Sequence, residues 1–544
     1  MDGGSIDDKP MPRLYLASLI LFASLAPRLT AGQAASAPTS TPVAATETEA
    51  ESLAASQADL PPPAGDELLA LSPLLDPEVR EVVSRALTHP ALRGARIGVH
   101  AVSLTTGAVL LRKNSQLLLN PASNAKLATS AAALSLLGPE YRFNTIYASD
   151  GEADAKQLRG NLYVQGRGDP SVTTERLLNV VHELRLLGIE KIEGRIVVDD
   201  SYFDDQREAK GWEQEDGDRT YLAPTGALAL NHNTVEVYVR PGAFEGAPAQ
   251  VQVDPPSEYV ELDANVTTTR WETQIFMRSW ERGGKNLVRL TGRIGTDQGP
   301  QRISRRAADP GLHFGSALAG VLNAAGIKVS SAVRRGLMPD RAKTLYIDRS
   351  PRLAEIVDEL NKWSNNFIAE QLVKVLGAEV AGKPGTFAHG LAAVHGFLEA
   401  EVGFAPGSYV CENGSGLNDV NRYTTEQLTR LLAYMYQHPE ASAEYITSLG
   451  VAGAQGTIAS RLRHTAAERR LRAKTGTLSN VSALSGYVVT ADGEVVAFSI
   501  LINDIQGRVR PVLEVQDMIG EALALNGGSR RNRENRLTLQ RRSP

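Results

Sequence analysis

A serine and a lysine three residues apart carry the clearest chemical signal in this sequence. Ser123-Asn124-Ala125-Lys126 is the one place where a lysine follows a serine by three positions. Residues 126–137 are rich in alanine and leucine, which predicts a helix, and residues three apart on a helix face the same side. A lysine takes the proton of a serine hydroxyl once burial or a nearby cation lowers its pKa. The pair therefore indicates a nucleophilic serine activated by a lysine.

Two further motifs supply partners for that pair. Ser364-Asn365-Asn366, the one S-x-N, lies between two predicted helical stretches, where a hydroxyl and an amide can project into a cleft. Lys474-Thr475-Gly476-Thr477, the one K-[ST]-G, precedes strand-like sequence, and on an edge strand its glycine would let a substrate backbone approach. Lys474 would add a cation that lowers the Lys126 pKa and attracts a carboxylate. Each motif alone has an ordinary structural explanation, but the three together, once each, predict one shared active site.

The elements that must position these motifs form an α/β pattern. Apolar runs around tight turns predict one β-hairpin at each end of the folded body, at residues 97–111 and 487–502. Between them, helical periodicity covers residues 353–375, 387–402 and 424–437, with a closing helix at 511–525. Strands at both ends with helices between them predict one α/β unit.

A β-rich region interrupts this unit. Residues 143–308 consist mainly of short strand-like runs separated by glycine, proline and aspartate, with one clear helix at about 175–187. We therefore expect a first catalytic part at residues 67–142, one or two inserted domains at 143–308, and a second catalytic part at 309–526.

Both ends of the chain differ in composition from this body. Leu14 to Ala26 is an apolar run behind Arg13, too short to span a bilayer comfortably and typical of a secretory signal. We expect a signal peptide at residues 1–35, an Ala/Pro/Thr/Ser-rich linker at 36–66, and a basic disordered tail at 527–544. An uncleaved N-terminal anchor and a start at Met11 stay open. The prediction is export to the periplasm or cell envelope, with a mature chain that is soluble and has no transmembrane anchor.

The overall composition excludes several classes of function. The 544 residues carry a net charge of −5, which argues against a nucleic-acid partner. A single cysteine, Cys411, and nine scattered histidines give no metal-ligand pattern, so no cofactor or metal is expected. Cys411 is interpreted as a packed residue, Trp363 as either a cleft or a core residue, and His389 and His395 are assigned no role.

The order of the three motifs resembles the penicillin-recognising serine acyl-transferases, which include penicillin-binding proteins and serine β-lactamases. The long insertion between Ser123 and Ser364 narrows the resemblance to the D-alanyl-D-alanine carboxypeptidase/endopeptidase family of low-molecular-mass class C penicillin-binding proteins. Four more stretches look like motifs of that family: residues 166–170, 197–203, 223–231 and 412–417. The similarity extends from about residue 82 to residue 525.

The resemblance implies a fold and a reaction. The fold would be α/β (α+β): a transpeptidase-like antiparallel sheet with helices, interrupted by the insertion. Ser123 would attack the carbonyl between two D-alanines of a peptidoglycan stem peptide while Lys126 accepts its proton. Ser364 would relay a proton to the leaving D-alanine, and water would release the acyl group. Penicillins and other β-lactams would acylate Ser123 as covalent inhibitors.

Substrate binding is implied for four further residues. Asn366 would hold the substrate amide, and Lys474 and Thr475 would hold the terminal carboxylate. The backbone N–H groups of Ser123 and Thr477 would form the oxyanion hole.

The sequence departs from the family pattern near the fourth stretch. Asn413 stands where the family has an aspartate, and Asn418-Asp419 replaces its Ser-Arg, which puts any charge contact of that aspartate in doubt. Two other functions are open, a serine β-lactamase and an inactive cell-wall-binding protein. The balance between carboxypeptidase and endopeptidase action is open as well.

Overall fold

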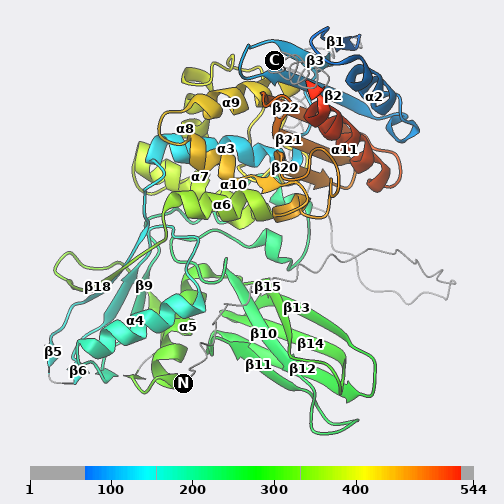
Figure 1. The fold of residues 1–544 in the computed structure, drawn as a ribbon. Helices are drawn as coiled ribbons and strands as arrows, with labels where there is room; N and C mark the ends of the chain where they lie inside the picture. Colours follow the sequence, from blue (N-terminus) through cyan, green and yellow to red (C-terminus); the bar gives the residue numbers. More distant parts are fainter. Residues whose placement is uncertain (1–67, 155, 331, 529–544) are drawn as a thin grey trace, which may run out of the picture. The chain divides into compact units, whose positions relative to one another are not determined.

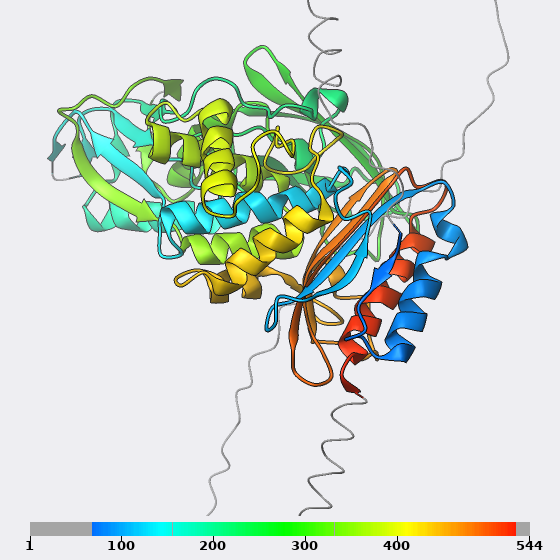
Figure 2. The same ribbon diagram turned by 90° about the horizontal axis from the view of Figure 1, so that it is seen from above.

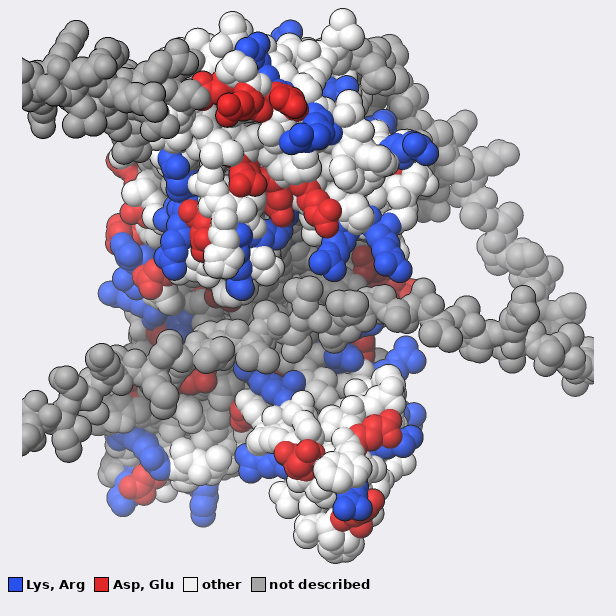
Figure 3. Space-filling model, turned by 45° about the vertical axis from the view of Figure 1, so that its right-hand side comes forward, with Lys and Arg blue, Asp and Glu red and all other residues white. Residues whose placement is uncertain are grey.

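The computed structural model describes residues 68–154, 156–330 and 332–528. The predicted signal peptide at 1–35, the linker at 36–66 and all but two residues of the basic tail lie outside the described residues. Within the described part, no helix has the length and apolar character needed to cross a bilayer. Figure 3 shows lysine and arginine side chains interspersed with aspartate and glutamate on the drawn face, in keeping with the small net charge.

A seven-stranded antiparallel sheet forms the centre of the catalytic part (Figure 1). Both predicted hairpins lie in it. The first and last parts of the catalytic unit are joined because β2 pairs with β22 from Arg96↔Asn503 to Ser103↔Val496. The strands, in spatial order, are β1 (Ala70–Leu71), β3 (Val109–Lys113), β2 (Arg96–Ser103), β22 (Val495–Asn503), β21 (Val481–Val489), β20 (Leu471–Leu478) and β19 (Gly450–Val451).

Helices cover both faces of this sheet (Figure 2). Each face of the sheet has its own apolar core, because successive side chains of β22 point to opposite faces. Phe498 and Ile500 pack against α2 (Pro77–Leu87) and α11 (Arg510–Leu525), whereas Leu501 faces the other helices. The helices on that other face are α3 (Lys126–Leu137), α6 (Leu353–Trp363), α7 (Asn366–Leu376), α8 (Phe387–Ala400), α9 (Thr425–Gln437) and α10 (Ser442–Ser448). The bounds of α3 are those predicted, and a capping box of Thr424 and Gln427 begins α9.

The insertion contains two separate apolar cores. One core lies between α4 (Thr174–Leu186), α5 (Pro310–Ala324) and a mixed sheet in the order β17-β9-β7-β4-β18. The strands of this part are β4 (Asn144–Ser149), β7 (Leu162–Gln165), β9 (Ile196–Asp199), β17 (Arg334–Arg335) and β18 (Lys343–Arg349), with β5 (Ala153–Asp154), β6 (Gln157–Leu158), β8 (Lys191–Ile192) and β16 (Lys328–Val329) in a smaller sheet.

The second core of the insertion lies between two three-stranded sheets. Val235 and Val237 of one sheet pack with Val288 and Leu290 of the other. The sheets are β11 (Gln250–Asp254), β10 (Thr234–Arg240) and β15 (Gln301–Arg306), and β12 (Val260–Thr269), β14 (Lys285–Gly295) and β13 (Gln274–Arg282).

The inserted region continues beyond residue 308, where the sequence pattern predicted its end. Helix α5 belongs to the first core of the insertion through Phe314 and Leu318, and β18 pairs with β4 from Lys343↔Ser149 to Arg349↔Asn144. The structure therefore groups residues up to 349 with the insertion. The sequence pattern indicated neither α5 nor β18, and the pairing of β18 with β4 joins segments too far apart for a local pattern to show.

Candidate active site

Ser123 and Lys126 lie at the point where the chain enters α3. Ser123 is in a 3₁₀ turn, η2 (Ala122–Ala125), that runs directly into the helix. Lys126 Nζ lies 3.0 Å from Ser123 Oγ, donates to Asn366 Oδ1 at 2.7 Å and also donates to the Ser415 carbonyl. The predicted pairing of hydroxyl and amine is therefore present, and the amine is 0% exposed.

Burial changes the acidity of this lysine. Desolvation lowers the pKa of Lys126 to about 7, and the Glu370 carboxylate partly opposes that shift. We expected the Lys474 cation to share in lowering the Lys126 pKa, but the lowering comes from burial. Near neutral pH a substantial fraction of Lys126 is thus unprotonated and able to accept a proton.

Ser364 occupies a strained position between α6 and α7. Its φ and ψ are 59° and 39°, a left-handed conformation that costs a non-glycine residue about 1 kcal/mol. Asn365 then caps α7, because its side chain accepts from the Ile368 N–H at 3.1 Å. The turn places Asn366 at the first residue of α7 and brings the Ser364 hydroxyl within 2.7 Å of Lys474 Nζ.

Lys474 reaches the same site from β20. It is 0% exposed and donates to the Ser364 hydroxyl and to the Thr475 carbonyl. Burial, and then the nearby Lys126, lower the pKa of Lys474 well below its usual value. The next residue, Thr475, has its hydroxyl 2.6 Å from that of Thr457, and Thr477 is exposed and lines a cavity.

Gly476 allows β20 to pass close to the serine. A Cβ at this position would lie 2.9 Å from the Pro121 carbonyl oxygen and 3.0 Å from the Ser123 backbone nitrogen. On its outer side, β20 pairs with β19 only at Arg472 and Ala473, so Lys474 onward has no strand partner there among the described residues. This edge can accept a substrate backbone as an added strand.

Glu370 is a site residue that the sequence analysis missed. It lies one helical turn after Asn366 on α7 and is 0% exposed. Its carboxylate accepts the backbone N–H groups of Gly414 at 3.1 Å and Ser415 at 2.8 Å. The spacing of four from Asn366 was visible in the sequence, but nothing there distinguished this glutamate from a surface charge.

The loop at residues 413–417 closes the site against η2. Gly416 is required, because a Cβ there would lie 1.9 Å from the Ala122 carbonyl oxygen, and its φ is +73°. The departure at Asn413 has a physical basis: its fully buried amide donates to the carbonyls of Lys210 at 2.9 Å and Leu417 at 3.1 Å. An aspartate cannot make these two donations.

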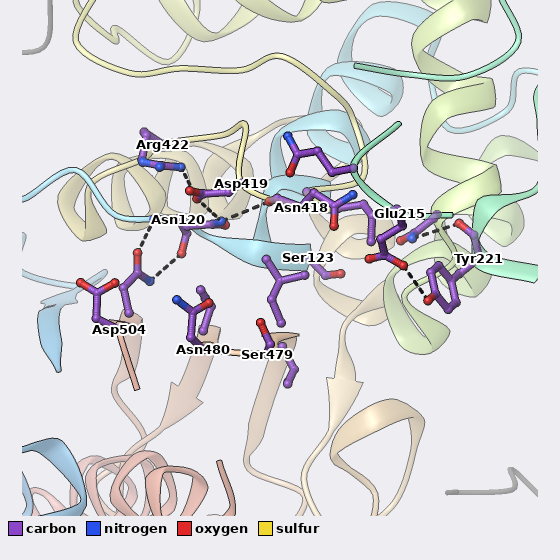
Figure 4. A pocket seen from close by; sticks show the side chains of 18 of the residues that line it. Asn120, Ser123, Glu215, Tyr221, Asn418, Asp419, Arg422, Ser479, Asn480 and Asp504 are labelled. Atoms are coloured by element: carbon purple, nitrogen blue, oxygen red, sulfur yellow. Dashed lines mark hydrogen bonds and ion pairs between the residues drawn. The ribbon is translucent and has the colours of Figure 1, made fainter. Parts of the chain in front are cut away.

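A cavity of about 620 Å³ opens over Ser123. Figure 4 shows Ser123 between Glu215 and Tyr221 on one side and Asn120 and Asp504 on the other. The Tyr221 hydroxyl donates to Glu215 at 2.7 Å, and burial raises the pKa of Tyr221 to about 12. Because η4 (Thr220–Leu222) belongs to the insertion, the inserted region forms one wall of the cavity.

The remaining residues named from the sequence lie outside the catalytic cluster. Cys411 is buried, and burial raises the pKa of its thiol to about 12, as expected for a packed residue. Trp363 is 52% exposed and is therefore not a core residue. His395 lies 2.7 Å from the Tyr409 hydroxyl, and His389 lies in the first turn of α8. Among the described residues, no group of three or more His, Cys, Asp or Glu is arranged to hold a metal ion.

Comparisons with known proteins show the family to which this chain is similar. The model of the D-Ala-D-Ala carboxypeptidase 3 (S13) family matches residues 79–520. A D-alanyl-D-alanine carboxypeptidase of Actinomadura sp. is 36% identical over 465 residues, covering 83% of this chain and 85% of the relative. The D-alanyl-D-alanine carboxypeptidase DacB of Haemophilus influenzae is 26% identical over 425 residues, 77% of this chain and 87% of the relative.

The fold is also found among solved structures. The crystal structure of penicillin binding protein 4 from Haemophilus influenzae superposes with a TM-score of 0.69 at 23% sequence identity, covering 82% of this chain and 99% of that chain. The similarity confirms the predicted fold class, in which a penicillin-binding-protein-like unit of antiparallel sheet and helices carries a large insertion.

Proposed function

The chain belongs to the D-Ala-D-Ala carboxypeptidase 3 (S13) family of serine peptidases, and on that premise we propose how its own residues carry out the reaction. The reaction is hydrolysis at D-alanyl-D-alanine, through an acyl-enzyme on Ser123. The observation that carries the proposal is the contact between the Ser123 hydroxyl and a fully buried lysine amine at 3.0 Å. The natural substrates would be peptidoglycan stem peptides and their D-alanyl cross-links.

Acylation begins with proton transfer. Unprotonated Lys126 accepts the Ser123 hydroxyl proton as Ser123 Oγ forms a bond to the carbonyl carbon of the penultimate D-alanine. Asn366 Oδ1 and the Ser415 carbonyl hold the lysine amine in place during this step. The pKa of about 7 suits the role, since a general base works best when its pKa lies near the working pH.

Collapse of the tetrahedral intermediate needs a proton on the leaving nitrogen. Ser364 is suited to relay to it the proton that Lys126 took from Ser123, because its hydroxyl accepts a hydrogen bond from Lys474 Nζ at 2.7 Å and lies in the same cluster as Lys126. The C–N bond breaks as the amine of the terminal D-alanine takes this proton, which leaves Lys126 unprotonated again. Water then attacks the ester on Ser123 while Lys126 accepts a proton from it, and Lys126 returns that proton to Ser123 Oγ as the acyl bond breaks.

Substrate binding follows the free edge of β20. The terminal carboxylate would lie at Lys474 and Thr475, and binding of this anion would raise the lowered pKa of Lys474 and favour its charged form. The backbone N–H groups of Ser123 and Thr477 would bind the oxyanion, an interaction worth about 10²–10³ in rate. Asn366 would hold the substrate amide.

The domain organisation and location of the protein belong to the same proposal. Residues 1–35 would direct export to the periplasm or cell envelope, and residues 36–66 would act as a linker. The catalytic unit would consist of residues 67–142 and the chain after the insertion. The region that begins at residue 143 would contribute the Glu215–Tyr221 wall to substrate selection.

Intact-protein mass spectrometry after brief incubation with benzylpenicillin tests the proposal. We expect one long-lived adduct that maps to Ser123, no adduct in Ser123→Ala, and release of D-alanine from a peptide ending in D-alanyl-D-alanine. Rapid drug hydrolysis without a lasting adduct would instead identify a β-lactamase. Neither an adduct nor D-alanine release, together with retained binding to cell-wall material, would identify an inactive wall-binding protein.

A further inference from the structure

The buried carboxylate of Glu370 has no part in the proton transfers described above, yet it contacts their framework. Both of its oxygens accept backbone N–H groups, from Gly414 and Ser415, in a region closed to solvent. A fully buried carboxylate is costly unless it is hydrogen-bonded or paired, and neither Gly414 nor Ser415 needs a charged acceptor to fold into a loop. We therefore looked for a role of the Glu370 carboxylate in the neighbouring active site.

Ser415 connects this carboxylate to the catalytic lysine. Its N–H donates to Glu370 while its carbonyl accepts from Lys126 Nζ. Asn366, one turn before Glu370 on α7, accepts from the same amine at 2.7 Å. Two of the three acceptors around Lys126 thus depend on this turn of α7: Asn366 belongs to it, and Ser415 is bound by Glu370 at its end.

The charged groups around this cluster come from three elements. Lys126 on α3 is faced by Lys474 from β20 and by Glu370 from α7. Glu370 is faced by Lys126 and by the thiol of Cys411, whose raised pKa leaves it neutral. Burial raises the pKa of Glu370, while its hydrogen bonds to Ser415 and Gly414 and the nearby Lys126 oppose that shift. Glu370 in turn opposes the lowering of the Lys126 pKa.

We propose that Glu370 is a positioning residue for acylation, which fixes the Ser415 carbonyl on Lys126 and supplies the negative charge that faces this lysine. The inference rests on the proposed function, because it assumes that Lys126 is the base. Without this charge, burial acts on Lys126 unopposed. The amine then loses its proton at lower pH and becomes a weaker base.

The pH dependence of acylation by benzylpenicillin measures this effect directly. In the native protein the rate should fall tenfold per pH unit below about 7, where Lys126 becomes protonated. In Glu370→Gln we expect the inflection to move to lower pH by about 1 unit or more, and the rate on the alkaline plateau to fall. Glu370→Asp keeps the charge, so its inflection should stay near that of the native protein while its plateau falls.

Thr129→Val is the matched control. The Thr129 hydroxyl donates to the Gly414 carbonyl at 2.8 Å, so its loss removes an uncharged contact to the same loop. We expect a lower plateau or melting temperature with no shift of the inflection.

Three results would overturn the assignment of Glu370. They are an unmoved inflection in Glu370→Gln, an equal shift in Thr129→Val, or, if the glutamine variant does not fold, a shifted inflection in Glu370→Asp. A native protein that benzylpenicillin does not acylate at any pH would contradict the proposed function instead.

Discussion

Lys126 and Lys374 are both fully buried lysines, but their surroundings give them different roles. Lys126, in the catalytic cluster, is hydrogen-bonded by Ser123, Asn366 and the Ser415 carbonyl, all uncharged. Lys374, four residues after Glu370 on α7, forms an ion pair with the Asp204 carboxylate at 2.5 Å.

The surroundings of Lys374 stabilise a charge. Its amine also donates to the carbonyls of Asp204 and Gln206 and lies 5.0 Å and 5.2 Å from the ring centres of Phe203 and Phe387. Burial lowers the pKa of Lys374 too, but the contacting carboxylate opposes the shift. This region, which we call the junction, connects the insertion to α7. The comparison supports the proposed division of roles, in which the direct partner of a buried lysine decides whether it exchanges protons or holds segments together.

The largest expected effect comes from exchanging the catalytic lysine for an uncharged side chain. Lys126→Met keeps the length of the side chain but removes the proton acceptor, so we expect the acylation rate to fall by about 10³–10⁴. Stopped-flow acylation with a chromogenic β-lactam measures the rate. Lys374→Met is the matched control from the junction and should keep most of the rate per folded molecule. Equal loss of rate in both variants would contradict the division of roles.

The next effect comes from the close approach of β20 to the serine. In Gly476→Ala the new methyl group meets the Pro121 carbonyl and the Ser123 nitrogen, which are backbone atoms that cannot move alone. The displacement should lower the acylation rate by about 10², the usual cost of misplaced reacting groups. Gly396→Ala, on α8, is the control, since a Cβ there meets nothing within 4 Å. An unchanged rate in Gly476→Ala would show that the strand does not set the position of Ser123.

Much of this site could be predicted from the sequence because its motifs are local. Ser123 and Lys126 lie within one helical turn, and Ser364 and Asn366 lie within three residues. Residues so close in sequence are close in space in any fold. The catalytic half of the fold was predictable for a similar reason: its hairpins and the helix α3 carry strong period-2 or alanine-rich patterns.

The missed features depend on contacts between distant segments. Glu370 and Lys374 are ionisable residues of α7, and the segments that they contact lie 45 and 170 residues away in the sequence. Asn413 departs from the family pattern in sequence, and the reason is its donation of two hydrogen bonds to the carbonyls of Lys210 and Leu417. The packing of α5 against α4 and the mixed sheet of the insertion likewise depends on contacts between distant segments.

A third, smaller effect concerns the stability of the junction. Lys374→Met leaves the carbonyls of Asp204 and Gln206 without their donor, and we expect the free energy of unfolding to fall by about 2 kcal/mol. The estimate is at the low end for a broken buried pair, because the Asp204 side chain is 27% exposed and water can solvate it. Urea unfolding followed by circular dichroism gives the value. A stability equal to that of the native protein would mean that the junction does not depend on this lysine.

The smallest effect should come from a second, more exposed contact between the same two parts of the chain. His232 of the insertion lies 3.1 Å from Glu359 on α6, with side chains 34% and 38% exposed. Solvent screens such a pair, so Glu359→Gln should change the free energy of unfolding by less than about 1 kcal/mol and leave acylation unchanged. The same urea titration, run beside Lys374→Met, ranks the two contacts. If Glu359→Gln proves as damaging as Lys374→Met, burial does not determine which contacts hold the insertion, and the contrast drawn between buried and exposed partners fails.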